Sequence, residues 1–199
     1  MKVRAVILSA ATIAALFAGC SHNQPEPLNA NELGLIFASD SLMRVLTVED
    51  SLDLAVLRAP SVDFALPDLS SDAFATLARK MVATVTSPEQ DGVGIAGPQV
   101  GLNRRVIAVQ RFDKPGEPFE VYPNIRITAV HGQQELGAEG CLSVPGKRGN
   151  VMRWRNVDIA YVCPETLRDT SESIHGFTAV IFQHECDHLD GVLYTDKSE

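Results

Sequence analysis

The sequence has no excess of basic residues. Its 17 lysines and arginines are outnumbered by 25 aspartates and glutamates, so the formal net charge at pH 7 is −8. Surfaces that bind nucleic acids are usually strongly basic, and we therefore expect no nucleic-acid partner. Internal repeats and low-complexity runs are absent as well. A chain of 199 residues is long enough for one domain with its own hydrophobic core.

The sequence also lacks an apolar run that would span a bilayer comfortably, which takes about 20 residues. The stretch Ala5–Gly19 is shorter, follows Lys2 and Arg4, and has the form of a secretory signal. It ends in Leu16-Phe17-Ala18-Gly19-Cys20. This ending resembles the lipobox of bacterial lipoproteins, in which the signal is cut before a cysteine that becomes lipidated.

This resemblance divides the chain into three parts. We expect a lipoprotein signal peptide at 1–19, a lipid-anchored tether and lead-in at 20–42, and a folded domain at 43–199. Acyl chains on Cys20 would hold an exported bacterial protein on a membrane, in the periplasm or at the cell surface, with no spanning helix. If the N-terminus is not a signal, the alternative is a cytoplasmic protein.

Cysteine is scarce. Once Cys20 is set aside, three thiols remain, at Cys141, Cys163 and Cys186. An odd number of thiols in an exported protein is a poor disulfide framework. At least one of them therefore needs another explanation, and a metal ligand is the one we favour.

The stretch Gln183–Gly191 contains the pattern H-E-x-x-H. On an α-helix the fourth residue along is displaced by about 40° and rises about 6 Å, so His184 and His188 share one face and can hold one metal ion. Glu185 beside them can take a proton from water bound to the metal. The pattern fixes only three positions, however, and also occurs by chance.

A catalytic zinc-type site usually has a third protein ligand. Only 199 − 188 = 11 residues follow His188, so we expect this ligand upstream. Cys186 lies about 200° around the helix from His184 and faces away. Cys141 is the preferred candidate because it follows Gly140, where backbone can approach a ligand closely. The other candidates remain open: Cys163, His131 and His175.

Hydrophobic spacing predicts two main helices. One begins at an N-cap, Ser70 or Ser71, and runs to Val85; the other begins near Gly176–Thr178, runs through His188 and is capped by Gly191. A short helix within 33–48, a strand at 43–48 and a turn-bounded apolar stretch at 54–60 are further expectations. Strands are predicted at 105–110, 119–122, 125–130 and 157–163.

The expected fold class is α+β. We expect antiparallel sheets around a central metal-binding helix that carries H-E-x-x-H near the C-terminus, plus one N-terminal amphipathic helix.

Three motifs together resemble those of the peptide deformylase family. They are Gly92–Gln99, Glu139–Ser143 and Gln183–His188, and the resemblance extends from about Met43 to Asp196. The chain departs from the family at Gly97, where alanine is usual. We expect this change to loosen the loop slightly and to leave Gln99 in place.

The resemblance implies an amidohydrolase linked to translation, which removes the formyl group from N-formyl-methionyl peptides and releases formate. It implies one Fe²⁺ per chain, which Zn²⁺ or Ni²⁺ can replace, bound by Cys141, His184 and His188. Metal-bound water, activated by Glu185, would attack the formyl carbon.

The same resemblance assigns further roles. The Gln99 side-chain amide and the Leu142 backbone N–H would stabilise the oxyanion, while Gly94, Gly140 and Arg148 would contact the peptide. We expect a monomer. Two alternatives are kept: a metallopeptidase, and a catalytically inactive peptide-binding lipoprotein on the same fold.

Overall fold

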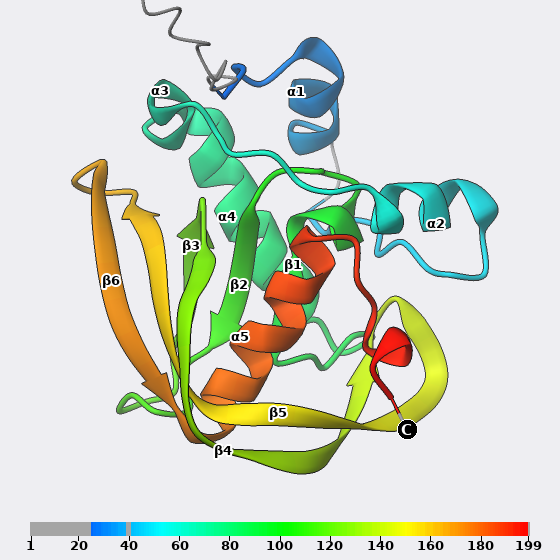
Figure 1. Ribbon diagram of the computed structural model, residues 1–199. Helices are drawn as coiled ribbons and strands as arrows, with labels where there is room; N and C mark the ends of the chain where they lie inside the picture. The colour runs from blue at the N-terminus through cyan, green and yellow to red at the C-terminus, as the bar shows by residue number, and fades with distance from the viewer. Residues whose placement is uncertain (1–24, 39–40, 199) are drawn as a thin grey trace, which may run out of the picture.

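The computed structural model describes residues 25–38 and 41–198. The expected signal peptide and the expected lipidation site at Cys20 lie outside these residues. No helix in the described part of the chain is long and apolar enough to cross a membrane. Along the chain (Figure 1), the elements are α1 Ala30–Ile36, α2 Ser51–Arg58, α3 Leu66–Leu69, α4 Asp72–Val85, β1 Gly94–Ala96, η1 Gly97–Val100, β2 Val106–Gln110, β3 Phe119–Pro123, β4 Arg126–Cys141, β5 Val144–Cys163, β6 Arg168–His175, α5 Gly176–Leu189 and η2 Tyr194–Asp196.

The strands form two antiparallel sheets of three strands each, in the orders β1-β2-β3 and β4-β5-β6. The long β4–β5 hairpin has register shifts, one of them between Gly140 and Cys141. Such irregularities bend a strand and redirect its side chains. The α+β class with antiparallel sheets is thus confirmed, as are the strands predicted at 105–110 and 119–122. The strands predicted at 125–130 and 157–163 are only parts of β4 and β5, which extend to Cys141 and begin at Val144.

Helix α5 lies between the two sheets, packed against β5, β1 and β2 (Figure 1). It is apolar on several sides, and one cluster of buried residues joins Ile181, Phe182, Cys186 and Leu189 to strand residues of both sheets. A helix buried on most of its surface holds its polar side chains in a fixed frame. Asp190 caps its C-terminus, and Gly191 follows with φ 72°, the left-handed conformation that glycine adopts without strain.

Helix α4 covers the other side of the β1-β2-β3 sheet. Its N-cap is Ser71, whose Oγ accepts a hydrogen bond from the N–H of Phe74 at 3.3 Å, as the sequence predicted. Phe74, Leu77, Met81 and Val85 form the buried stripe that the spacing indicated. This helix and β1 together support the loop that enters the cavity described below.

The segment before residue 43 is more ordered than a tether. Asn29 and Glu32 form a capping box at the start of α1, and Ile36 at its end is fully buried in the core. The guanidinium of Arg104 binds both carboxylate oxygens of Glu32 and the carbonyl of Glu26. Residues 25–38, which belong to the expected tether and lead-in at 20–42, therefore pack against the domain.

Several local features differ from the expectations. The expected single N-terminal amphipathic helix is α4, but the helices α1, α2 and α3 precede it. Residues 43–48 form no strand, because their backbone N–H groups donate to separate parts of the chain and to no single neighbouring strand. Leu46 N–H donates to the carbonyl of Gln99 and Val48 N–H to that of Ser143, while Met43 and Thr47 donate to the side chains of Thr84 and Asp53. The stretch 54–60, expected to be bounded by turns, belongs mostly to α2, which Asp50 caps. Strand β6 was missed because its residues are mostly polar and exposed, which leaves no apolar alternation to detect.

Candidate active site

Three potential metal-binding side chains meet between the end of β4 and helix α5. Sγ of Cys141 and one ring nitrogen each of His184 and His188 lie within 4.8 Å of one another. Sγ of Cys141 is 3.2 Å from Nε2 of His188. A sulfur and a nitrogen bound to one tetrahedral Zn²⁺-like ion are about 3.5 Å apart. The donor set and its spacing therefore fit one divalent metal ion.

The two histidines differ in environment. Burial alone would lower the pKa of His184, but the contacts with Cys141 and the Glu139 carboxylate raise that pKa to about 10. Burial lowers the pKa of His188 well below its ordinary value, and the charge of His184 lowers it further. The surroundings of His184 thus favour positive charge, whereas the ring of His188 is held neutral. A bound cation suits both conditions.

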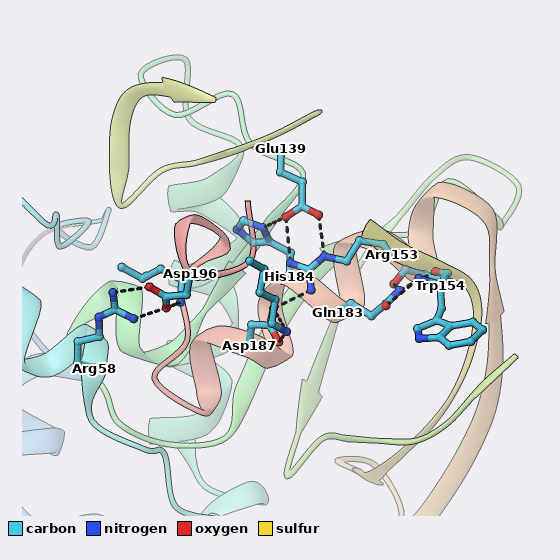
Figure 2. A network of polar contacts seen from close by, with 11 residues as sticks. Arg58, Glu139, Arg153, Trp154, Gln183, His184, Asp187 and Asp196 are labelled. Carbon is cyan, nitrogen blue, oxygen red and sulfur yellow. Dashed lines mark hydrogen bonds and ion pairs between the residues drawn. The ribbon is translucent and has the colours of Figure 1, made fainter. Parts of the chain in front are cut away.

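A buried chain of charges supports His184 (Figure 2). Glu139 accepts a hydrogen bond from Nδ1 of His184 at 2.8 Å, and Nε and Nη2 of Arg153 donate to the same carboxylate at 2.7 and 3.0 Å. Nη1 of Arg153 donates to Asp187 on α5 at 2.7 Å. Because Glu139 binds Nδ1, Nε2 is left to face Cys141 and His188.

Glu185 is placed for proton transfer. Its side chain is 4% exposed, and Oε2 has no hydrogen-bond partner among the described residues. Burial raises the pKa of this carboxyl to about 7, even though the charge of His184 lowers it. A Cβ on Gly94 would collide with Oε1 of Glu185, so only glycine allows β1 to pass this close to α5. An unpartnered buried carboxyl with a near-neutral pKa can accept and return a proton.

The side-chain amide of Gln99 points toward Cys141. Its Oε1 accepts a hydrogen bond from the N–H of Ala96 at 2.8 Å, which fixes the direction of the amide. Nε2 then lies 3.6 Å from Sγ of Cys141 and 3.2 Å from Oγ of Ser143. The amide N–H₂ of a fully buried glutamine is therefore available as a donor beside the three clustered side chains.

The loop that holds Gln99 is tighter than expected. A Cβ on Gly97 would lie 2.6 Å from the carbonyl oxygen of Arg104 and 2.7 Å from that of Leu102. Both distances are far shorter than a methyl group tolerates. Glycine at this position therefore brings two backbone segments together, and the expected loosening of the loop is wrong.

Gln99, Cys141, His184 and Glu185 line a cavity of about 850 Å³. The remaining residues assigned from the sequence, Leu142, Gly94, Gly140 and Arg148, all line it. Arg148 stands opposite Gly140 in the β4–β5 ladder. A Cβ on Gly140 would meet only ordinary contacts, the nearest at 3.7 Å to Cγ of Arg148, so packing alone does not require glycine there.

The other potential ligands lie elsewhere. His131 is exposed and pairs with Asp158, and His175 contacts Asn156. Cys186 is buried in the core, as its position on the helix predicted. Cys163 is half-buried, and its thiol donates to Glu165 at 3.0 Å.

Sequence reasoning missed the roles of Glu139 and Tyr194. The available signal for Glu139 was its place in the motif Glu139–Ser143, two residues before Cys141. Nothing in the sequence indicated Tyr194, whose ring stacks on that of His184 with 6.1 Å between the centroids.

Comparisons with known proteins agree with this arrangement. The family model for polypeptide deformylase matches residues 42–199. A peptide deformylase of Leptospira biflexa is 35% identical over 156 residues, which are 71% of this chain and 82% of that protein. A peptide deformylase of Synechocystis is 37% identical over 143 residues, which are 71% and 73% of the two chains.

Solved structures of peptide deformylases are similar to this chain as well. The crystal structure of a class I type b peptide deformylase from Acinetobacter baumannii with Met-Ala-Ser bound superposes with a TM-score of 0.69 at 33% identity, and the match covers 78% of this chain and 98% of that one. The actinonin-bound structure of an Acinetobacter baumannii class I type b peptide deformylase matches with the same score and identity, over 79% and 99% of the two chains. The chain therefore belongs to the peptide deformylase family.

Proposed function

We propose that this protein is a metal-dependent hydrolase that removes the formyl group from N-formyl-methionyl peptides and releases formate. The observation that carries this proposal is the meeting of Cys141, His184 and His188 beside the unpartnered carboxyl oxygen of Glu185, at one wall of the cavity. Family membership supplies the reaction class. The helix α5, which carries two of the three donors, is then the metal-binding helix at the centre of the fold.

We propose one Fe²⁺ per chain as the native ion, with Zn²⁺ or Ni²⁺ able to replace it. One thiolate and two imidazoles suit all three ions, so the donor set supports a divalent transition metal without selecting among them. When bound, the ion lowers the pKa of water and polarises a carbonyl group. Cys141, His184 and His188 would hold it, and Glu139 would keep His184 in the tautomer that binds through Nε2.

The protein side chains divide the remaining work. Glu185 takes a proton from the attacking water and later delivers it to the departing amine. The Gln99 amide donates to the oxygen that becomes negatively charged, and the backbone N–H of Leu142, at the wall of the cavity, is the proposed second donor. Backbone near Gly94 and Gly140 would pair with the extended peptide, with Arg148 alongside.

The test is formate release from formyl-Met-Ala-Ser by full-length protein, purified anaerobically and loaded with Fe²⁺. We expect turnover, and a fall in kcat of about 10²–10⁴-fold in Glu185→Gln with unchanged metal content. Glu165→Gln, an exposed carboxyl outside the cavity, is the matched control. Cleavage of internal bonds in unformylated peptides would favour a metallopeptidase, whereas peptide binding without any turnover would favour an inactive binding lipoprotein.

We further propose that the protein is exported and anchored, as a monomer, through a lipid on Cys20. The motif before Cys20 supports this location. Membrane fractionation of wild type and Cys20→Ser provides the test, and we expect the wild type in the membrane fraction and the variant in the soluble fraction. Equal solubility of the two would favour a cytoplasmic protein, and light scattering of the variant would give its oligomeric state.

A further inference from the structure

Most cations in the described part of the chain have a carboxylate partner. Arg44, Arg58, Arg104, Arg105, Arg111, Arg126 and Arg153 each form an ion pair at 3.1 Å or less. Within residues 25–38 and 41–198, four cations have neither an ion pair nor a side-chain hydrogen bond: Arg79, Lys147, Arg148 and Arg168. In an acidic protein, cations without partners are the exception, and their positions are informative.

Two of these four cations are neighbours at the mouth of the cavity. Lys147 and Arg148 are exposed and line it, whereas Arg79 on α4 and Arg168 at the start of β6 do not. Arg148 stands opposite Gly140, one residue before Cys141, and its Cγ lies over the glycine. Positive charge is thus available beside the path that a peptide would take away from the metal-binding side chains.

The acidic groups at this cavity do not cancel that charge. Glu139 is bound by Arg153 and His184, and Glu185 lies at the bottom of the cavity next to the histidines. Asp91 is exposed in the segment that leads into β1, and it has no ion pair with Lys147 or Arg148. The β4–β5 rim of the cavity is therefore positive and unpaired.

A formyl peptide carries no charge at its blocked N-terminus, but a short free peptide carries a carboxylate at its C-terminus. An extended chain advances about 3.3 Å per residue, so the carboxylate of a tripeptide lies about 10 Å from the formyl group. The formyl group would lie next to Cys141. The long side chains of Lys147 and Arg148, which start beside Gly140, can therefore reach the position of that carboxylate. A protein N-terminus in the same place would present a neutral peptide bond instead.

We propose that Lys147 and Arg148 bind the C-terminal carboxylate of short formyl peptides, so that free peptides of two or three residues are favoured substrates. This proposal rests on the proposed deformylase activity. The two cations act on specificity and do not take part in the chemistry. Because both are exposed, the preference is modest and weakens with salt, since the Debye length falls from about 30 Å at 0.01 M to about 10 Å at 0.1 M.

The test compares formyl-Met-Ala-Ser as the free acid, as the C-terminal amide, and formyl-Met-Ala-Glu amide, with metal-loaded full-length protein. We expect kcat/KM for the acid to exceed that for the Ser amide about 3- to 10-fold at low salt, and much less at 0.5 M salt. The double variant Lys147→Ala/Arg148→Ala removes the preference, so that acid and amide have equal kcat/KM. The double variant Arg79→Ala/Arg168→Ala, with the same change in net charge, retains it.

Two results would overturn the proposal: equal kcat/KM for acid and amide in the wild type, or a preference that survives the Lys147/Arg148 double variant. A preference for the Glu amide over the free acid would assign the cations to acidic side chains instead. Titration of the product Met-Ala-Ser, as acid and as amide, gives the same comparison without turnover. If neither substrate yields formate, the proposed function fails, while equal binding of the two products rejects the carboxylate site by itself.

Discussion

Nδ1 of His184 donates a hydrogen bond to Oε2 of Glu139 over 2.8 Å, from the central helix to the end of strand β4. Arg153 holds the same carboxylate with two further hydrogen bonds and reaches Asp187, one turn along from His184. Strand and helix are therefore joined through the imidazole itself. Any change in Glu139 is expected to act on metal binding before it acts on peptide binding.

Replacing Glu139 by glutamine should weaken metal binding. Glutamine keeps the shape but removes the charge that Arg153 and His184 both need, so the tautomer and orientation of His184 are less well defined. We expect the affinity for Zn²⁺ to fall about 10- to 100-fold, measured by competition with a chelator. Glu135→Gln, an exposed change on the same strand, should leave it unchanged. Equal affinities in wild type and Glu139→Gln would contradict this role.

Glu139 should also make stability depend on pH under acidic conditions. Burial would raise its pKa, but hydrogen bonds from His184 and Arg153 outweigh burial and lower the pKa from 4.5 to about 2. A carboxyl with a lowered folded-state pKa stabilises the fold above pH 4.5 and loses that contribution as the pH falls toward 2. In EDTA, the free energy of unfolding in urea should therefore fall by about 2 kcal/mol more in wild type than in Glu139→Gln between pH 5.5 and pH 3. If the free energy of unfolding depends on pH in the same way in wild type and Glu139→Gln, Glu139 is not the source of the acid sensitivity.

Gln99→Glu should reduce kcat while leaving peptide binding nearly intact. The carboxylate can still accept the hydrogen bond from Ala96, but it offers no N–H to the developing oxyanion and adds a negative charge there. Loss of one oxyanion donor lowers kcat about 10²- to 10³-fold. Steady-state kinetics on formyl-Met-Ala-Ser are the measurement. Gln90→Glu makes the same chemical change elsewhere at the cavity wall and should change kcat by far less.

Gly97→Ala introduces the residue that is usual in the family and should nevertheless destabilise this protein. The new methyl group would lie 2.6 and 2.7 Å from two backbone carbonyl oxygens, which cannot rotate away as a side chain could. We expect a loss of about 1–3 kcal/mol in the free energy of unfolding, measured in urea. Gly137→Ala is the control, because a Cβ there meets nothing within 4 Å. A Gly97→Ala protein as stable as wild type would mean that the two segments separate at little cost.

Glu32→Gln should weaken the attachment of the N-terminal segment. Arg104 is 3% exposed and binds both carboxylate oxygens of Glu32. Burial would raise the pKa of Glu32, but these contacts with Arg104 lower it. Removing the charge leaves the buried guanidinium partly unpaired and should cost about 1.5–3 kcal/mol. Proteolysis near residue 38 and urea unfolding report the effect. Glu49→Gln, exposed and without an ion pair among the described residues, should have no effect on either.

The sequence by itself was sufficient for the features that depend on local order. The spacing of His184 and His188 sets both rings on one face of a helix, because the helical repeat allows nothing else. The apolar stripe of α4 and its Ser71 cap follow from the same periodicity. Cys141, the third ligand that the sequence favoured, lies beside the two histidines.

Only the tertiary structure decided the features that depend on residues distant in the chain. The contact between Glu139 and His184 spans 45 residues, and that between Arg104 and Glu32 spans 72. The tight approach at Gly97 depends on carbonyl groups of Leu102 and Arg104, which no local pattern predicts. Local propensities specify which residues face the same way along one element. Which buried charges meet depends on how the sheets pack around α5, because a carboxylate that stays charged away from water needs a partner.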